Sequence, residues 1–412
     1  MKRAVRTILP WALLSLALHV PAQPPKPQAR APRAAAQAPQ VDASGMAEAR
    51  LIDIYRMVAA GQGRLALEKA ETLVTDYPSF QLAHLLYGDL LAARARPLRQ
   101  AGDVPEGIKQ IGATALEELQ DESRMRLKAL RERPPAGALP AQFLAVSQRS
   151  RHAIAVDASR ARLYLFENHA DGLKLVADYY VSVGKSGIEK NVEGDLRTPL
   201  GVYYITSHLD RSTLTDFYGS GALPINYPNM LDTRRGKTGK GIWLHGTPPG
   251  QFSRPPKATD GCVVLANPDL LKIIRTVSAG STPVVIAERL SWIPAQTART
   301  QGESFQATLN AWKAAKSAAD LNKLLAFYAP DFNSYGRTLQ QWAPTLQADM
   351  VRAKGRGVEL KDLSLLHWTD AGETMVVTFG EVSQGSVSGT VRRQYWTRQG
   401  PQWKIFFEGV IG

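Results

Sequence analysis

The chain has 412 residues, of which 44% are hydrophobic and 21% charged, and 50 Lys and Arg against 37 Asp and Glu give a net charge of +13. At roughly 100–200 residues per domain, this length allows two to four domains, and the apolar content excludes a wholly disordered protein. The single cysteine, Cys262, excludes an intramolecular disulfide and any zinc or iron–sulfur site built from several cysteines. The basic balance favours anionic partners without choosing among them.

The first residues have the pattern of a secretory signal peptide. Lys2, Arg3 and Arg6 form a positive start, an apolar run covers 8–20, and small residues end it at 20–22. The run is shorter than the ~20 residues that span a bilayer, which makes a permanent anchor the weaker alternative. We therefore predict that 1–22 is removed, and that an exported, soluble protein with a net charge of +10 and no permanent membrane span remains.

Two segments of different character follow the predicted signal peptide. Residues 23–45 are rich in Pro and Ala, cannot bury a core, and are predicted to form an extended linker. Over 46–135 the apolar residues recur at helical spacing, with a break at Pro78, which predicts a helical region. Its segment 61–94 resembles one tetratricopeptide-type helix pair, although a plain helical hairpin is the alternative.

The periodicity changes to two at about residue 150, which predicts a β-rich domain over 150–290. A polar segment at 291–304 is expected to be a second linker, and a third domain of helices and strands is expected over 305–412. The predicted fold class is thus a multidomain α and β protein with a helical N-terminal region, a mostly-β central domain and an α+β C-terminal domain.

The lone cysteine lies in a distinctive context. His245 ends one short apolar strand and Cys262 enters another, with a 16-residue, proline-rich loop between them. If the two strands are neighbours, both side chains lie at the same edge of a sheet, where an imidazole can take the proton of a thiol. Gly261 allows close approach of a substrate, and backbone N–H groups near Gly261 and Cys262 could face a developing oxyanion. Spacing alone leaves open whether Cys262 is catalytic or a buried apolar residue.

These residues resemble the catalytic motif of the L,D-transpeptidases, the YkuD-type domain. His245-Gly246 and Thr259-Asp260-Gly261-Cys262 stand where that family has His-Gly and Ser/Thr-X-Gly-Cys. The strand that begins at Thr198-Pro199 and the closing strand at 280–286 are also similar to the family's, and the likeness covers about 150–290.

The resemblance implies cysteine-dependent acyl transfer on the stem peptides of peptidoglycan, without a cofactor or metal. It makes Cys262 the nucleophile and His245 the base, with the Gly246 carbonyl orienting the imidazole and the Gly261–Cys262 backbone binding the oxyanion. An amine acceptor would resolve the thioester. If water does so instead, the enzyme is an amide hydrolase or carboxypeptidase. A non-enzymatic cell-wall-binding protein is the alternative of a different class.

The sequence departs from the family at two positions. Asp260 stands where the family commonly has His or Arg, and Val264 where many members have Arg or Asn. A carboxylate beside the thiolate would raise the thiol pKa, and the departures leave open which groups bind the substrate carboxylate. Arg234 and Arg235, in the basic segment 234–240, and Arg197 are candidates for substrate binding, although a solvated loop is an equal reading of the segment.

The remaining features indicate no further chemistry. The other histidines are scattered without metal-ligand spacing, and the absence of a Walker-type loop or basic–aromatic interleaving argues against nucleic acid. The last hundred residues resemble a nuclear transport factor 2-like (SnoaL-like) cone through Trp312, an expected helix over Asp320–Phe332 and the strand that ends at 402–405. We expect this domain and the helical region to bind protein partners or to dimerise.

Overall fold

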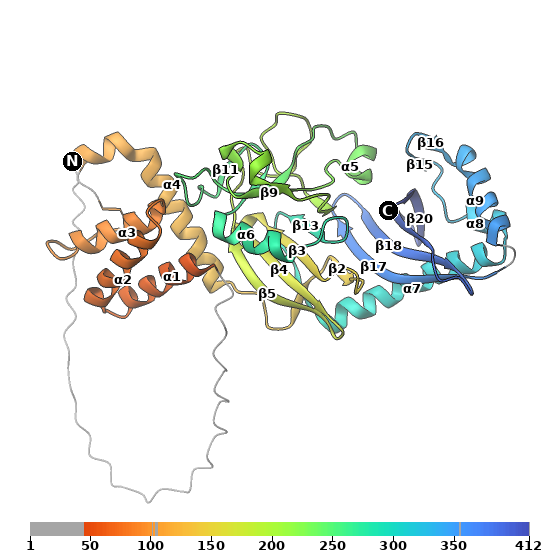
Figure 1. The fold of residues 1–412 in the computed structure, drawn as a ribbon, viewed down its shortest axis with the longest axis horizontal. Helices are drawn as coiled ribbons and strands as arrows, with labels where there is room; N and C mark the ends of the chain where they lie inside the picture. Colours follow the sequence, from red (N-terminus) through yellow and green to blue (C-terminus); the bar gives the residue numbers. More distant parts are fainter. Residues whose placement is uncertain (1–44, 101, 104–105, 354–355, 412) are drawn as a thin grey trace, which may run out of the picture. The chain divides into compact units, whose positions relative to one another are not determined.

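The computed structural model describes residues 45–100, 102–103, 106–353 and 356–411. The predicted signal peptide at 1–22 and all but the last residue of the predicted linker at 23–45 lie outside the described residues. The described residues form one compact unit, and its helices and sheets confirm the predicted multidomain α and β fold (Figure 1). Among the described helices, none combines the length and apolar character needed to cross a membrane.

Four helices form the N-terminal region. They are α1 (Met46–Ala59), α2 (Gly63–Asp76), α3 (Gln81–Ala92) and α4 (Glu106–Arg131). The apolar stripe predicted from the sequence is buried between α1, α2 and α3, where Leu51, Leu73 and Leu82 pack around Phe80. The α2–α3 pair is a helical hairpin that turns where Pro78 interrupts the helical pattern.

The central domain contains a five-stranded sheet of order β5-β4-β3-β13-β7 and a four-stranded sheet of order β12-β10-β9-β8. The first sheet comprises β3 (His152–Asp157), β4 (Arg162–His169), β5 (Gly172–Tyr180), β7 (Gly201–Tyr204) and β13 (Pro283–Ala287). The second comprises β8 (Leu209–Asp210), β9 (Gly221–Pro224), β10 (Trp243–His245) and β12 (Val263–Val264). Smaller elements are β6 (Val183–Gly184), which pairs with β11 (Lys257–Thr259), and the helices α5 (Met230–Arg234) and α6 (Asn267–Thr276), with 3-10 turns at Ala158–Arg160, Arg211–Thr213 and Asp216–Tyr218.

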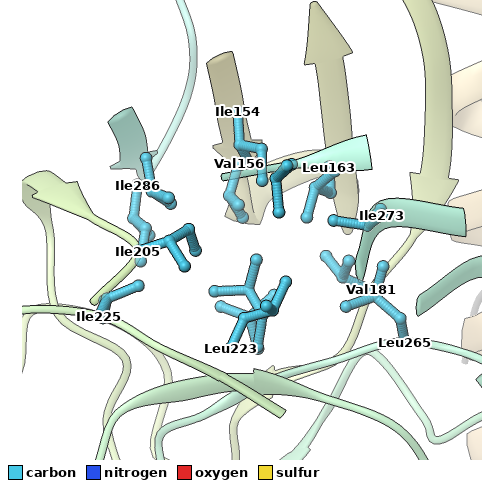
Figure 2. Close-up of a cluster of buried hydrophobic side chains, with 14 of the residues drawn as sticks. Ile154, Val156, Leu163, Val181, Ile205, Leu223, Ile225, Leu265, Ile273 and Ile286 are labelled. Atoms are coloured by element: carbon cyan, nitrogen blue, oxygen red, sulfur yellow. The ribbon is translucent and has the colours of Figure 1, made fainter. Parts of the chain in front are cut away.

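Strands β3 and β13 pair in parallel and are buried on both faces, which explains their nearly continuous apolar sequences. Ile154 and Ile286 point into a core that also contains Leu223 from the second sheet and Ile273 from α6 (Figure 2). The alternate residues, such as Ala155 and Val285, pack in a separate cluster on the other face. The five-stranded sheet therefore separates two hydrophobic cores.

The C-terminal domain is a five-stranded sheet of order β2-β17-β18-β19-β20 with helices on one face. Its strands are β17 (Val358–Thr369), β18 (Glu373–Ser383), β19 (Thr390–Gln399) and β20 (Gln402–Val410), with β2 (Phe143–Ala145) at the edge. Its other elements are α7 (Ala295–Ser317), α8 (Leu321–Leu325), α9 (Leu339–Ala353) and the pair β15 (Asn333–Ser334) and β16 (Arg337–Thr338). Trp312 of α7 is fully buried against this sheet.

Two sequence expectations about this region are wrong. The segment 291–304 is not a linker, because it forms β14 (Trp292–Pro294), which pairs with β1 (Ala138–Pro140), and the first ten residues of α7. Gly302 lies buried inside α7 beside Leu144 of β2. The helix expected over Asp320–Phe332 is confined to α8, because Ala329 then pairs its backbone N–H with Ile405 of β20.

A buried ionic network joins the helical region to the central domain. Glu48 of α1 is only 2% exposed and accepts hydrogen bonds from Arg162 of β4 at 2.8 Å and from Arg126 of α4 at 2.7 Å. Arg126 also binds Glu122, and Arg162 also binds Asp178. Burial opposes ionisation of Glu48, but the two arginines hold the pKa of its carboxyl below the usual value. Each buried charge in this network thus has an opposite partner.

This network predicts that Arg162→Met lowers the free energy of unfolding by about 3 kcal/mol or more, because it leaves Glu48 buried with one arginine instead of two. Arg56→Met, which removes an exposed pair with Asp53, is the matched control and should change stability by less than about 1 kcal/mol. Urea denaturation followed by circular dichroism measures both. Equal stability of the two variants would contradict the prediction.

Candidate active site

Strand pairing brings His245 and Cys262 to the same face of the four-stranded sheet. Strands β10 and β12 are parallel neighbours in which Leu244 lies opposite Val263, and His245 opposite Val264. Side chains alternate along a strand. Since Leu244 and Val263 point into the core, His245 and Cys262 point to the opposite face. The expected juxtaposition of the two strands is therefore present.

The thiol of Cys262 lies partly buried at the start of β12. It donates a hydrogen bond to the Gly241 carbonyl oxygen over a distance of 3.5 Å. Burial raises the pKa of the Cys262 thiol, a hydrogen bond from the Trp243 backbone and the charge of Arg254 oppose this, and Asp260 adds to it. Asp260 itself is exposed and forms an ion pair with Lys185 at 2.9 Å. The side chain of Cys262 is thus held as a neutral thiol at rest.

The imidazole of His245 is held in one tautomer and kept neutral. The side chain is 1% exposed, and Nδ1 lies 2.7 Å from the Gly246 carbonyl oxygen, the contact that the family resemblance implied. A carbonyl oxygen only accepts, so Nδ1 carries the proton and Nε2 has the free lone pair. Burial next to the rings of Phe217 and Tyr218 lowers the pKa of His245 to about 4, with Arg254 adding to the effect.

The turn before Cys262 needs glycine and is fixed by two threonines. Gly261 has φ of +123°, and a Cβ there would lie 2.7 Å from the Arg197 carbonyl oxygen. Thr198 Oγ1 donates to the Gly261 carbonyl oxygen, and Thr259 Oγ1 donates to that of Cys262 at 2.7 Å. The Gly261 N–H donates to Thr259 Oγ1. This bond corrects the expectation that the Gly261 N–H is free to face an oxyanion.

A cavity of about 340 Å³ opens over the two residues. Its lining includes Cys262, His245, Thr259 and Asp260, together with Lys240, which ends the basic segment 234–240. Two further cationic side chains of the lining, Lys190 and Arg254, were not singled out from the sequence. The Lys190 ammonium binds Asp195 at 2.7 Å, and Lys240 is exposed. Arg254 lies in the loop between the His and Cys strands, where the sequence shows it as one basic residue before two prolines.

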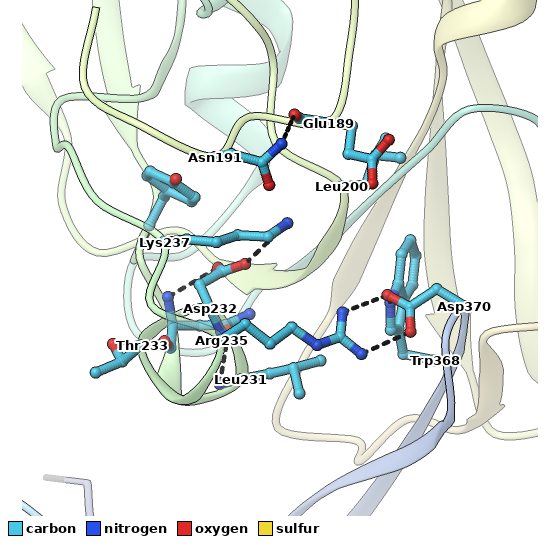
Figure 3. Close-up of polar contacts among 12 residues, drawn as sticks. Glu189, Asn191, Leu200, Leu231, Asp232, Thr233, Arg235, Lys237, Trp368 and Asp370 are labelled. Carbon is cyan, nitrogen blue, oxygen red and sulfur yellow. Dashed lines mark hydrogen bonds and ion pairs between the residues drawn. The ribbon is translucent and has the colours of Figure 1, made fainter. Parts of the chain in front are cut away.

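The three arginines proposed from sequence do not line this cavity. Arg235 pairs with Asp370 of the C-terminal domain (Figure 3), and Arg234 pairs with Asp331. The Arg197 guanidinium is exposed and donates to the Ile188 carbonyl oxygen. The interpretation of Arg234 and Arg235 as substrate-binding groups is wrong because their charges are neutralised by carboxylates about a hundred residues away in the sequence.

Asn267, at the start of α6, holds the turn that follows His245. Its side-chain oxygen accepts from the Ser220 N–H at 2.8 Å, and its side-chain nitrogen donates to the Thr247 carbonyl oxygen at the same distance. A Cβ at Gly246 would lie only 2.0 Å from the Asn267 oxygen. The Gly that follows the histidine is thus required by this close approach. Over the described ranges, no three His, Cys, Asp or Glu side chains are grouped so that they could hold a metal ion.

Comparison with known proteins defines both main domains. Residues 151–286 match the family model of the YkuD L,D-transpeptidase catalytic domain. Residues 304–409 match that of the Cds6 C-terminal NTF2-like domain. The chain therefore contains a YkuD-type catalytic domain followed by an NTF2-like domain, which confirms both sequence resemblances. Its function is accordingly L,D-transpeptidase-like and related to peptidoglycan.

Two solved structures are similar to this chain over most of their length. Bd1075 from Bdellovibrio bacteriovorus is 26% identical, with a TM-score of 0.57 over 66% of this chain and 98% of that one. The helical cell shape determining protein Pgp2 from Campylobacter jejuni is 21% identical, with a TM-score of 0.51 over 71% of this chain and 100% of that one, and shows likeness of fold. No curated protein matches the sequence.

The environment of His245 predicts an imidazole that stays neutral well into the acid range. Its pKa of about 4 lies below the usual value, so the base form is present above pH 4 and is lost as the pH falls through it. An NMR titration of the imidazole Cε1–H signals measures this, and the His245 signal is the one absent from His245→Gln. A midpoint near 6.5 while the protein remains folded would contradict the prediction.

Proposed function

We propose that the protein is an exported cysteine L,D-transpeptidase that acts on peptidoglycan stem peptides through an acyl-enzyme on Cys262. The observation that supports this best is the placement of Cys262 and His245 on one face of two adjacent parallel strands, at a common cavity in a YkuD-type domain. The predicted signal peptide supports export, and the basic composition suits a carboxylate-rich polymer.

In the proposed first step, His245 Nε2 takes the thiol proton as Sγ attacks the carbonyl carbon of the residue before the terminal D-amino acid. The Gly246 carbonyl stabilises the imidazolium through Nδ1–H. The Cys262 N–H donates to the oxyanion. The carbon–nitrogen bond then breaks, the leaving amine takes the proton from His245, and a thioester remains on Cys262.

In the second step an amine acceptor attacks the thioester, His245 takes a proton from that amine, and the thiolate leaves and regains a proton. The product is a crosslink, an attached amine or an exchanged D-amino acid. Attack by water gives instead the amide hydrolase or carboxypeptidase reaction, and muropeptide masses separate the two because only transfer adds the mass of an amine.

Removal of Cys262 should abolish this chemistry in a folded protein, and removal of His245 should slow it strongly. With disaccharide-tetrapeptide as donor, intact-protein and product mass spectrometry should show an acyl-enzyme and product for the wild type, and neither for Cys262→Ala. For His245→Ala the rate of acylation should fall by about 10²- to 10⁴-fold, the usual contribution of a general base. Circular dichroism confirms that both variants are folded.

Full activity of Cys262→Ala would overturn the proposal. The non-enzymatic alternative is tested with a carbapenem, which acylates an activated cysteine. A folded wild-type protein that shows no mass increase on Cys262 with either carbapenem or donor peptide would support a wall-binding protein with an inert thiol.

A further inference from the structure

The loop between the two catalytic strands is anchored in the helical N-terminal region. Phe252, at the middle of this loop, is buried in the core of helices α1–α3. Its ring stacks on Phe80 with centroids 4.2 Å apart and meets the edge of Tyr77 at 5.5 Å. Its backbone N–H donates to the Ser79 carbonyl oxygen. A ring buried in this way fixes the path of the loop relative to the helices.

The next two residues are fixed by polar contacts, one from the helical region and one from the central domain. Ser253 is buried, and its hydroxyl donates to Glu122 of α4 at 2.8 Å. The Arg254 carbonyl oxygen accepts from the Tyr180 hydroxyl at 2.9 Å. Arg126, which binds Glu122, lies over the Tyr180 ring at 3.9 Å. The backbone that carries Arg254 is therefore held by the buried ionic network described above.

The side chain of Arg254 is a buried cation without an ion-pair partner. The residue is 9% exposed and lines the cavity with Cys262 and His245. Among the described residues, the buried Arg126 and Arg162 each bind two carboxylates, whereas Arg254 forms no ion pair. Its guanidinium lies over the Phe217 ring at 4.8 Å. Asp260, on the same cavity, is already bound by Lys185.

A buried guanidinium with unused donors is a site for a planar anion. Burial lowers the pKa of Arg254, and the charges of Asp260 and Cys262 oppose this only in part. A carboxylate matches the guanidinium fork and can accept two parallel hydrogen bonds from it. A bound carboxylate would replace the water that burial has removed from the cation.

We propose that Arg254 binds the terminal carboxylate of the donor stem peptide, and that the helical region positions Arg254 through Phe252 and Ser253. The inference rests on the proposed function, because the scissile amide must lie at Cys262. The carboxylate of the leaving D-amino acid is separated from that amide by one carbon atom, so a group that shares the cavity with the thiol can reach it. The helical region is then a part of substrate recognition.

The test compares a tetrapeptide donor that ends in a carboxylate with the same donor ending in a carboxamide. The wild-type protein should be acylated by the carboxylate donor with a kcat/KM about 10- to 100-fold higher than by the carboxamide donor. This is the rate effect expected from charge-assisted hydrogen bonds. Arg254→Gln should lose most of this preference, and Arg254→Lys should retain a part of it. The matched control is Arg275→Gln, an exposed arginine at the end of α6, which should keep the full preference.

The positioning role is tested in the helical contact. Phe252→Ala should reduce the preference for the carboxylate donor, because the loop loses its anchor, while Phe252→Leu should largely restore it by filling the same space. Lower activity with both donors and an unchanged ratio would indicate a general structural effect and would overturn the positioning role.

Equilibrium binding of both peptides to Cys262→Ala and to the double variant with Arg254→Gln separates recognition from chemistry. Suppose that the peptide ending in a carboxylate binds more tightly than the carboxamide peptide, that this preference depends on Arg254, and that the wild-type protein is never acylated. This result would refute the proposed function but retain the carboxylate site. Equal binding of the two peptides, or a preference that survives Arg254→Gln, would overturn the inference even if Cys262 is acylated. Binding to Arg254→Lys decides the question if Arg254→Gln does not fold.

Discussion

The parallel pairing of β10 with β12 is the constraint on which the site depends. It places His245 and Cys262 on one face, but parallel neighbours cannot be joined by a tight turn, and the chain between them must leave the sheet and return. In this protein the connection reaches the helical region, where Phe252 is buried, and comes back through β11 beside β6. The same connection carries Arg254 into the cavity, so the geometry that places His245 and Cys262 together also brings a cation beside them.

The electrostatics of the site follow from its position between a core and a cavity. Both reacting groups are neutral at rest, because burial raises the pKa of the thiol and lowers that of the imidazole. In the proposed mechanism, charge separates only as the proton moves from Cys262 to His245, and the groups that would stabilise this charge are already in place. The Gly246 carbonyl faces the imidazole. The Arg254 guanidinium lies over the Phe217 ring, and no carboxylate among the described residues forms an ion pair with it, while the Tyr180 hydroxyl holds the Arg254 backbone.

The sequence was sufficient for the parts of the site that rest on local pattern. The alternating apolar pattern predicted the strands that carry His245 and Cys262. The sequence around the cysteine indicated the need for Gly261, and the family resemblance implied that the Gly246 carbonyl orients the imidazole. Arg234 and Arg235 were misread because nothing local reveals Asp331 and Asp370 as their partners. Arg254 was missed for the same reason, since its burial depends on Phe252 fitting a core built from residues about 170 positions earlier in the chain. The segment 291–304 was misread because its polar residues cover one side of α7, whose other side is buried.

The C-terminal domain is joined to the catalytic domain by strand pairing and by a shared hydrophobic cluster, and not only by the connecting chain. The segments that precede and follow the catalytic domain pair with each other as strands β1 and β14, in which Ala138 lies opposite Pro294. Strand β2, which precedes the catalytic domain, completes the edge of the C-terminal sheet. The face of the five-stranded sheet opposite the catalytic core packs on the C-terminal sheet in one hydrophobic cluster that includes Val285 and Tyr395. Because β3 and β13 are apolar on both faces, the catalytic sheet needs this cover to stay out of water. The domain thus has a structural role in the catalytic unit, whatever ligand its own surfaces bind.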